Sequence, residues 1–304
     1  MKERMKVIGL RLKTRAIEIY RCPKDPRMLR LNHDTNLLKI IACLAMLSDH
    51  AGKMLFSTGA FGDLMYFRVN GDVLRFLFPA GHIMRIIGRL AMPMFAYGIA
   101  VGAAYSRNVW KYAIRLFIMG ILVHPLYMEA MGHVKLAAFD WQSNFYRIDL
   151  IVKYYFANKG NIFFTLTSGA LILGAVRSKS PWLLILFVFL TWKYQGMLDY
   201  GVKGVMLIVL FYLFLEKPVL SFVSVFLFMW YWGMPNYFTR GVMSSSIQLY
   251  ALYSLPLIYL PLRKRYLKMP KWFFYAFYPG HLALIYSILR WFPGPIQILE
   301  RMIK

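Results

Sequence analysis

The chain is divided into long apolar runs that are separated by short segments rich in Lys and Arg. The runs cover residues 37–56, 82–104, 112–128, 161–177, 181–194, 201–216, 218–234, 242–262 and 271–290. Several of them reach the length of about 20 mostly apolar residues that a helix needs to cross a bilayer. Because lipid offers no hydrogen-bond partners to the backbone, such runs can cross it only as helices. The pattern predicts an all-α, polytopic membrane bundle of about nine to ten transmembrane helices.

Charge supports the same interpretation. The chain has 37 Lys and Arg against 13 Asp and Glu, a net charge of +24. In a soluble protein such an excess suggests nucleic acid as a partner. Here the cations gather in loops beside apolar runs, where the positive-inside rule and anionic headgroups account for most of them. We therefore expect membrane lipid among the partners, and no nucleic acid.

Residues 1–36 precede the first apolar run and contain ten Lys or Arg. From Ile8 to Ile19 apolar residues recur near helical spacing, which is typical of a basic amphipathic helix on the cytoplasmic membrane surface. A disordered basic leader is an equally good alternative. We predict this N-terminal segment, 1–36, followed by a single transmembrane domain, 37–304. An outer segment at 129–160 is expected to hold an interfacial element.

The first apolar run carries Lys39, Asp49, His50 and Lys53. Charges at the centre of a membrane helix cost about 2.5–3.5 kcal/mol each, so they must face protein or a wet cavity. Lys39 and His50 are eleven residues apart, which is three helical turns and roughly 16 Å along one face. This spacing suits a ligand with an anionic head at the rim and a reacting group deep in the span, such as an acyl-CoA. Alternatively, Lys39 snorkels to the membrane edge and His50 bonds between helices.

Arg85 and Arg89 lie four residues apart in the second run, and both need anionic or carbonyl partners inside a membrane. Asp49 is the natural candidate. In a catalytic interpretation these charges orient His50, the general base, and stabilise a developing oxyanion. Asp49 itself stands about 100° around the helix from its neighbour His50, which indicates an indirect role. The alternative is a structural ion pair that holds the first two helices together.

Two further places carry candidate site residues. Tyr278 and His281 share a face of the last run, either beside the site or in simple aromatic packing. Asp199, Tyr200 and Lys203 stand at the outer end of the sixth run, where we favour an interfacial anchor over a lining of the acceptor entry.

Two patterns point away from ligand chemistry. The small-residue motif formed by Gly98 and Gly102 favours helix packing rather than ligand contact. The histidines outside the first and last runs show no grouping with Cys or acidic residues that would predict a metal site.

Five segments in order along the chain resemble the TraX family of integral membrane proteins, which is named for a pilin N-acetyltransferase. They read LKIIACLAMLSDHAGKMLF, RIIGRLAMPMFAYGIAVGAAYSRN, NIFFTLTSGALIL, DYGVKGVMLIVLFYLF and KWFFYAFYPGHLALIY. The spacing of Lys39 and His50 is also similar to a signature of membrane acyltransferases that acylate sugars. The resemblance implies a multi-pass enzyme of the bacterial cytoplasmic membrane, with residues 37–304 as its acyltransferase domain.

The resemblance also implies roles for single residues. His50 is the expected catalytic histidine, with Asp49, Arg85 and Arg89 beside it. Lys39 is expected to bind the acyl donor, and Tyr278 and His281 are assigned to the same donor site.

In function, the resemblance implies transfer of an acetyl group from cytoplasmic acetyl-CoA to an acceptor presented at the membrane. The acceptor is an amine, such as a peptide or pilin N-terminus, or a hydroxyl of a surface polymer. The sequence leaves open whether His50 acts as a base or as a transient acyl carrier. A transporter of an anionic or peptide substrate is the main alternative, although the strongest charges gather in the first two runs without a counterpart in a second half. An assembly subunit for surface polymers is a third.

Overall fold

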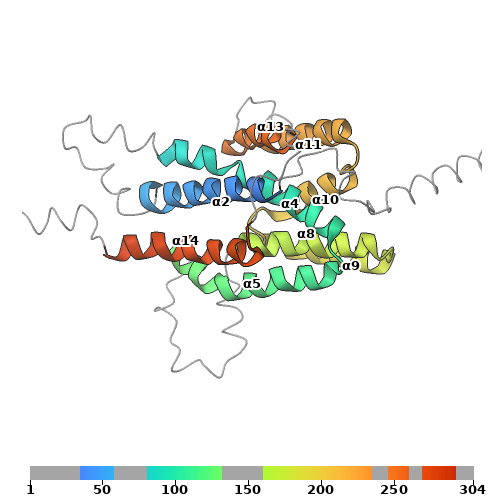
Figure 1. The fold of residues 1–304 in the computed structure, drawn as a ribbon, viewed down its shortest axis with the longest axis horizontal. Coiled ribbons are helices and arrows are strands. Elements are labelled where there is room, and N and C mark those ends of the chain that lie inside the picture. The colour runs from blue at the N-terminus through green and yellow to red at the C-terminus, as the bar shows by residue number, and fades with distance from the viewer. Residues whose placement is uncertain (1–34, 58–80, 132–159, 235–245, 260–268, 292–304) are drawn as a thin grey trace, which may run out of the picture.

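The computed structural model describes residues 35–57, 81–131, 160–234, 246–259 and 269–291 (Figure 1). Within these ranges every regular element is a helix, so the all-α prediction is confirmed for this part of the chain. The basic segment 1–36 and the outer segment 129–160 lie outside the described residues, except for their edges.

The helices follow the predicted apolar runs. In chain order they are α2 (Thr35–Ala51), a π-helical turn (Gly52–Ser57), α4 (Ala91–Tyr105), α5 (Val109–Ala130), α8 (Ile162–Arg177), α9 (Pro181–Lys193), a 3₁₀ turn (Gln195–Met197), α10 (Gly201–Leu213), α11 (Pro218–Gly233), a 3₁₀ helix (Ile247–Tyr253), α13 (Ser254–Tyr259) and α14 (Lys271–Trp291). Residues 81–88 form a further helical segment before α4.

Arg89 and Leu90 interrupt the helix between segment 81–88 and α4. Pro93 has no N–H, so it cannot bond to the carbonyl of Arg89 four residues earlier. The Arg89 N–H still reaches the carbonyls of Arg85 at 3.2 Å and Ile86 at 3.1 Å, which gives a mixed, loosened turn. This turn is the point from which the Arg89 side chain extends towards α2.

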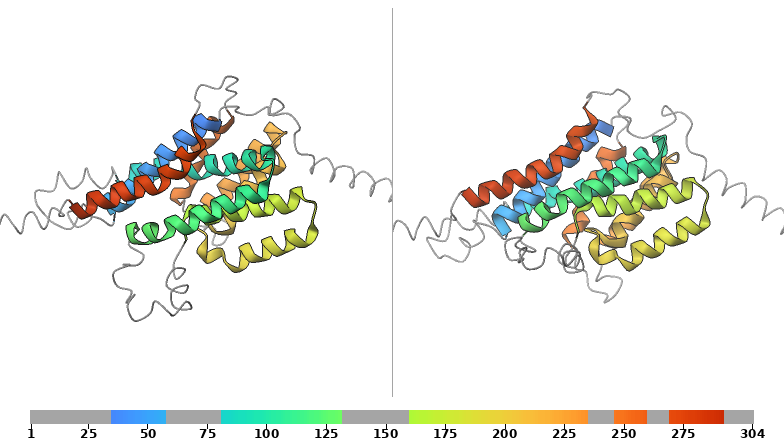
Figure 2. Two further views of the ribbon diagram at one scale, coloured as in Figure 1. Left: turned by 60° about the horizontal axis from the view of Figure 1, so that its bottom comes forward. Right: turned by 90° about the horizontal axis from the view of Figure 1, so that it is seen from below.

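The two innermost helices are α4 and α8, and each buries most of its residues. Helix α4 packs against α2, α8 and α10, while α8 packs against α4, α5, α9 and α10. Figure 2 shows α2 and α14, the blue and red helices, side by side in both views. Lys39 meets Phe274, and further along both helices His50 meets His281, so α2 and α14 run parallel.

Helix α9 has the reverse of the polarity expected in water. The side chain that it buries is Thr191, whereas Trp182 is 80% exposed and Ile185 is 61% exposed. Helix α11 exposes a similar apolar face that includes Val219 and Leu227. A helix that exposes large apolar side chains and buries a polar one is rare on soluble monomers, whereas this pattern is expected where a helix contacts lipid.

Two helices in the described part of the chain, Gly81–Tyr105 and Val109–Ala130, are long and apolar enough to cross a membrane, and five shorter apolar helices accompany them. The chain is therefore a helical protein with membrane-capable helices. The count of nine to ten spans remains a prediction.

If the exposed face of α9 contacts lipid, a charge on it must be costly. Ile185→Arg is expected to destabilise the inserted protein by about 2.5–3.5 kcal/mol, because an Arg at the helix centre leaves water for hydrocarbon. Thermal unfolding in nanodiscs, together with the fraction that remains in the membrane after alkaline extraction, measures this effect. Gln195→Arg, at the exposed turn after α9, is the matched control and should change stability by no more than about 0.5 kcal/mol. Equal behaviour of the two variants would contradict a lipid-facing α9.

Candidate active site

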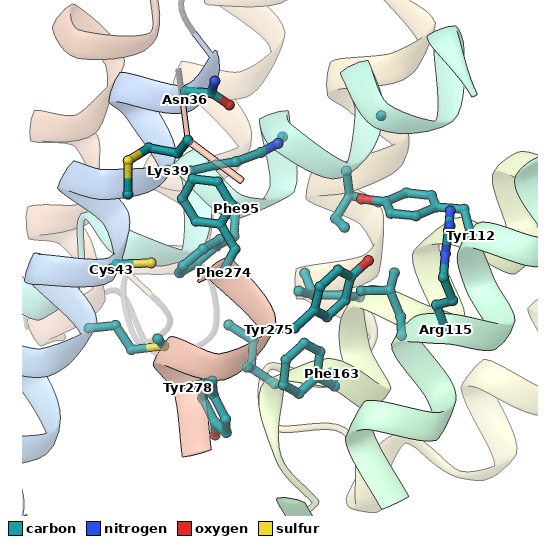
Figure 3. A pocket seen from close by; sticks show the side chains of 18 of the residues that line it. Asn36, Lys39, Cys43, Phe95, Tyr112, Arg115, Phe163, Phe274, Tyr275 and Tyr278 are labelled. Carbon is teal, nitrogen blue, oxygen red and sulfur yellow. The ribbon is translucent and has the colours of Figure 1, made fainter. Parts of the chain in front are cut away.

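A cavity of about 520 Å³ lies among α2, α4, α5, α8 and α14 (Figure 3). Its volume is in the range of sites that hold a small-molecule ligand. Lys39 of α2 extends into it from one wall, and Tyr112 and Arg115 of α5 stand on the opposite wall. Tyr278 of α14 lies at the far end. The cavity thus has a cationic rim and a largely apolar interior.

Lys39 is held at this rim by an aromatic neighbour. Its Nζ lies over the ring of Phe274, 5.4 Å from the centroid, which is a cation–π arrangement. Below it, Cys43 and Met46 follow on the same face of α2 at intervals of three or four residues and also line the cavity. The helical period therefore places Lys39, Cys43 and Met46 in a row that leads inward.

This row of α2 side chains ends at a second, smaller cavity of about 30 Å³, which is lined in part by His50. Both cavities are lined by Met46, Ile162 and Tyr278, so they meet at these three residues. The small cavity with His50 therefore adjoins the inner end of the large cavity. The predicted relation between these two residues along one face of α2 agrees with this arrangement.

His50 is in direct contact with His281. The Nδ1 atom of His50 lies 2.7 Å from Nε2 of His281, and the two rings are nearly parallel with centroids 5.0 Å apart. The Nδ1 atom of His281 lies 2.8 Å from the carbonyl oxygen of Phe277. Tyr278 stands edge-on to His50 at 6.0 Å. Tyr278 and His281, predicted to share a face of the last helix, are thus both brought to His50, and only Tyr278 also lines the large cavity.

Asp49 forms an ion pair with Arg89. Both side chains are mostly buried, with 15% and 13% of their surfaces exposed. Close approach of the two segments is possible because residue 88 is Gly, since a Cβ at that position would overlap the Asp49 side chain. Five residues before Arg89, the carbonyl of Met84 accepts a hydrogen bond of 3.0 Å from the hydroxyl of Ser48. The predicted pairing of Asp49 with an arginine of the second run is confirmed for Arg89.

Arg85 lies one helical turn before Arg89 and has no ion-pair partner among the described residues. It lines neither cavity, its Cγ lies close to Gly52, and its Nε is buried without a hydrogen-bond partner among the described residues. The four-residue spacing is kept, because the Arg89 N–H still bonds to the Arg85 carbonyl at 3.2 Å, so both arginines lie on the face that meets residues 49–52.

Asp199 and Tyr200 line the small cavity together with Asp49 and His50. The Tyr200 N–H donates to the Thr165 hydroxyl at 3.4 Å, and its phenol, which is uncharged at neutral pH, can donate a hydrogen bond. Sequence reasoning slightly preferred an interfacial anchor for this pair. The structure places it beside His50 instead.

Three more residues of the large cavity were not recognised as such from the sequence. Arg115 was not singled out from the sequence, although its position as the seventh residue of an apolar helix was an available signal. Gly98 and Gly102, interpreted as a packing motif, line the large cavity. A Cβ added at Gly98 would lie 3.6 Å from Cε of Lys39. In the described part of the chain no group of three or more His, Cys, Asp or Glu side chains could hold a metal ion.

Comparison with known proteins supports the family resemblance. The family model described as TraX protein matches residues 34–290. A probable fimbrial assembly protein FimC, serogroup H1, of Dichelobacter nodosus is 30% identical over 146 residues, which is 47% of this chain and 48% of the relative. The match thus spans about half the length of that curated relative. No solved structure matches the chain.

The close approach at residue 88 can be tested by Gly88→Ala. The added Cβ would overlap Asp49, so we expect a loss of stability of about 1–3 kcal/mol from overpacking. Gly280→Ala in α14 is the matched control, because a Cβ there meets no atom within 4 Å. Thermal unfolding of both variants in nanodiscs provides the comparison. A Gly88→Ala protein as stable as Gly280→Ala would contradict the packing of segment 81–88 on α2.

The ion pair can be tested by a double-mutant cycle with Asp49→Asn and Arg89→Gln. Each single change leaves a buried, unpartnered group and should cost about 3–5 kcal/mol. The double variant should cost less than the sum, with a coupling energy of about 0.5–3 kcal/mol, because the two groups interact directly. Unfolding free energies of the four proteins give the coupling. Strict additivity would contradict the pair.

Proposed function

The chain belongs to the TraX family, and from this premise we propose that it is a membrane acyltransferase that moves an acetyl group from acetyl-CoA to an amine or hydroxyl of a membrane-presented acceptor. The observation that carries the proposal is the succession of a cationic rim, an apolar cavity of about 520 Å³ and an adjoining small cavity lined by the partly buried His50. This arrangement of the two cavities matches a donor with phosphates at one end and a thioester at the other.

The donor would enter from the cytoplasmic side. The turn between α4 and α5 and the turn after α8 lie together, because Arg177 donates to the carbonyls of Ala103 at 2.7 Å and Ser106 at 2.6 Å. Both turns are rich in cations, and the positive-inside rule assigns such a cluster to the cytoplasm. Ser106 also lines the large cavity, so the cavity reaches this basic end.

In the bound state, Lys39 and Arg115 would hold the CoA phosphates from opposite walls. Charge-assisted hydrogen bonds of this kind are about twice as strong as neutral ones. The pantetheine arm would follow Cys43 and Met46 inward, and the thioester would lie near Tyr278, where the two cavities meet. The apolar walls exclude water and so protect the thioester from hydrolysis.

His50 would then act on the reaction in one of two ways. As a general base it removes the proton of the acceptor while the acceptor attacks the thioester carbonyl; as a nucleophile it carries the acetyl group transiently. Tyr200 and Tyr278 line the same small cavity, and their hydroxyls are the candidate donors to the oxyanion. Arg89 is paired with Asp49 and would support the site indirectly. A direct role of Arg85 or Arg89 in stabilising the oxyanion has less support, because neither side chain lines the small cavity.

The acceptor would reach His50 from the side opposite to the donor, past Asp199 and Tyr200. We favour the N-terminal amine of a membrane-held peptide such as pilin, since the family resemblance implies this substrate and a relative is described as a probable fimbrial assembly protein. A multi-pass location in the bacterial cytoplasmic membrane follows from the same reasoning.

Donor binding and turnover can be tested with purified protein in nanodiscs. His50→Ala is expected to lower the rate of CoA release from acetyl-CoA about 10²–10⁴-fold, because it removes the base. Lys39→Ala should weaken acetyl-CoA binding roughly 10–100-fold, since it removes a charge-assisted contact of about 1.5–3 kcal/mol. Ligand-induced thermal shifts and CoA release report the two effects separately.

Lys193→Ala is the matched control for Lys39→Ala. Lys193 also lies over an aromatic ring, that of Tyr194 at 5.6 Å, but it is exposed at the end of α9 and lines neither cavity. Its replacement should leave acetyl-CoA binding unchanged. Folded wild-type protein that shows no stabilisation by millimolar acetyl-CoA would contradict the donor assignment and favour a transporter instead.

A further inference from the structure

The hydrogen bonds around His281 define the tautomer of His50. A carbonyl oxygen can only accept, so the 2.8 Å contact with Phe277 requires a proton on Nδ1 of His281. In a neutral imidazole the other nitrogen is then bare, and Nε2 of His281 must be an acceptor. The atom 2.7 Å away, Nδ1 of His50, must therefore be the donor.

A neutral His281 is the consistent choice. The ring is only 5% exposed, and its described polar contacts are an imidazole and a backbone carbonyl. A charged imidazolium in this position would be a buried cation without a carboxylate among those contacts, which is costly. The two hydrogen bonds therefore have a defined direction: His50 donates to His281, and His281 donates to the Phe277 carbonyl.

We propose that His281 is a positioning residue that holds His50 as the Nδ1-protonated tautomer and so leaves its Nε2 lone pair free for the reaction. The proposal rests on the proposed acetyl transfer for its catalytic meaning. It changes the role of His281 from the donor contact expected from the sequence to orientation of the base. The stacked rings, with centroids 5.0 Å apart, also limit rotation of His50.

The consequence for the reaction can be written in full. The bare Nε2 of His50 accepts the proton of the acceptor amine or hydroxyl as the acceptor atom bonds to the acetyl carbonyl carbon. The thioester C–S bond then breaks, and the proton on Nε2 passes to the departing CoA thiolate. His50 returns to its starting tautomer, while Nδ1 keeps its proton and its bond to His281 throughout.

The tautomer can be observed directly in full-length protein in nanodiscs that carries ¹⁵N-labelled histidine. Long-range ¹H–¹⁵N spectra distinguish protonated from bare ring nitrogens, and the His50 signals are identified by their loss in His50→Gln. Wild-type protein should show a protonated Nδ1 and a bare Nε2. In His281→Leu this preference should be lost. In His281→Gln it should persist, because the amide oxygen can replace Nε2 as the acceptor.

Kinetics supply the second readout. His281→Leu should lower kcat about 10²–10⁴-fold, as expected when a base is no longer presented in its reactive form, with little change in the KM for acetyl-CoA. His281→Gln should retain kcat within about tenfold. His124→Leu is the matched control, since His124 is another fully buried histidine, on α5, and its loss should leave the His50 tautomer unchanged.

A His50 with a protonated Nε2 in wild-type protein, or one whose tautomer is the same in His281→Leu, would overturn the proposal. So would a His281→Leu protein with normal kcat and a raised KM, which would make His281 a donor contact. If His281→Leu does not fold, the wild-type and His281→Gln spectra decide the matter. The predicted tautomer in a protein without acetyl-CoA turnover would support the hydrogen-bond assignment and contradict the acetyltransferase function.

Discussion

The ion pair between Asp49 and Arg89 sets the position of the elements around the candidate site. Charges carried on apolar helices need a partner, and only a side chain from another helix can provide one here. The pair joins α2 to the turn at which segment 81–88 meets α4, and Gly88 lets the two backbones come close enough. His50, next to Asp49 in the chain, is thereby turned towards α14.

The environment of the helices explains why polar groups gather inside. In water, apolar side chains form the core and polar ones the surface. In α9 the order is reversed, with Thr191 buried and large apolar side chains exposed. The same reversal places His50, His281, Asp49, Arg89 and Tyr200 between helices, where His50 bonds to His281 and Asp49 pairs with Arg89. An interior of this kind provides directional contacts that dispersion packing alone does not.

Local patterns were sufficient for much of the fold. Apolar runs predicted the helices to within a few residues, because helix formation under lipid-like conditions depends mainly on the composition and length of the run itself. The common face of Lys39 and His50 also followed from the helical period. The pairing of Asp49 with Arg89 rather than with Arg85 did not, because it depends on how α2 and segment 81–88 cross.

The sequence by itself determined an all-helical chain of the TraX family, the face of α2 that carries Lys39 and His50, and the need of Asp49 for an arginine partner. Tertiary structure alone decided that the partner of Asp49 is Arg89 and that Tyr200 lies beside His50. It also decided that His281, 231 residues further along the chain, contacts Nδ1 of His50. The reason is geometric. Spacing along one helix sets which side chains share its face, whereas contact between faces depends on how separate helices cross, and no local pattern encodes that crossing.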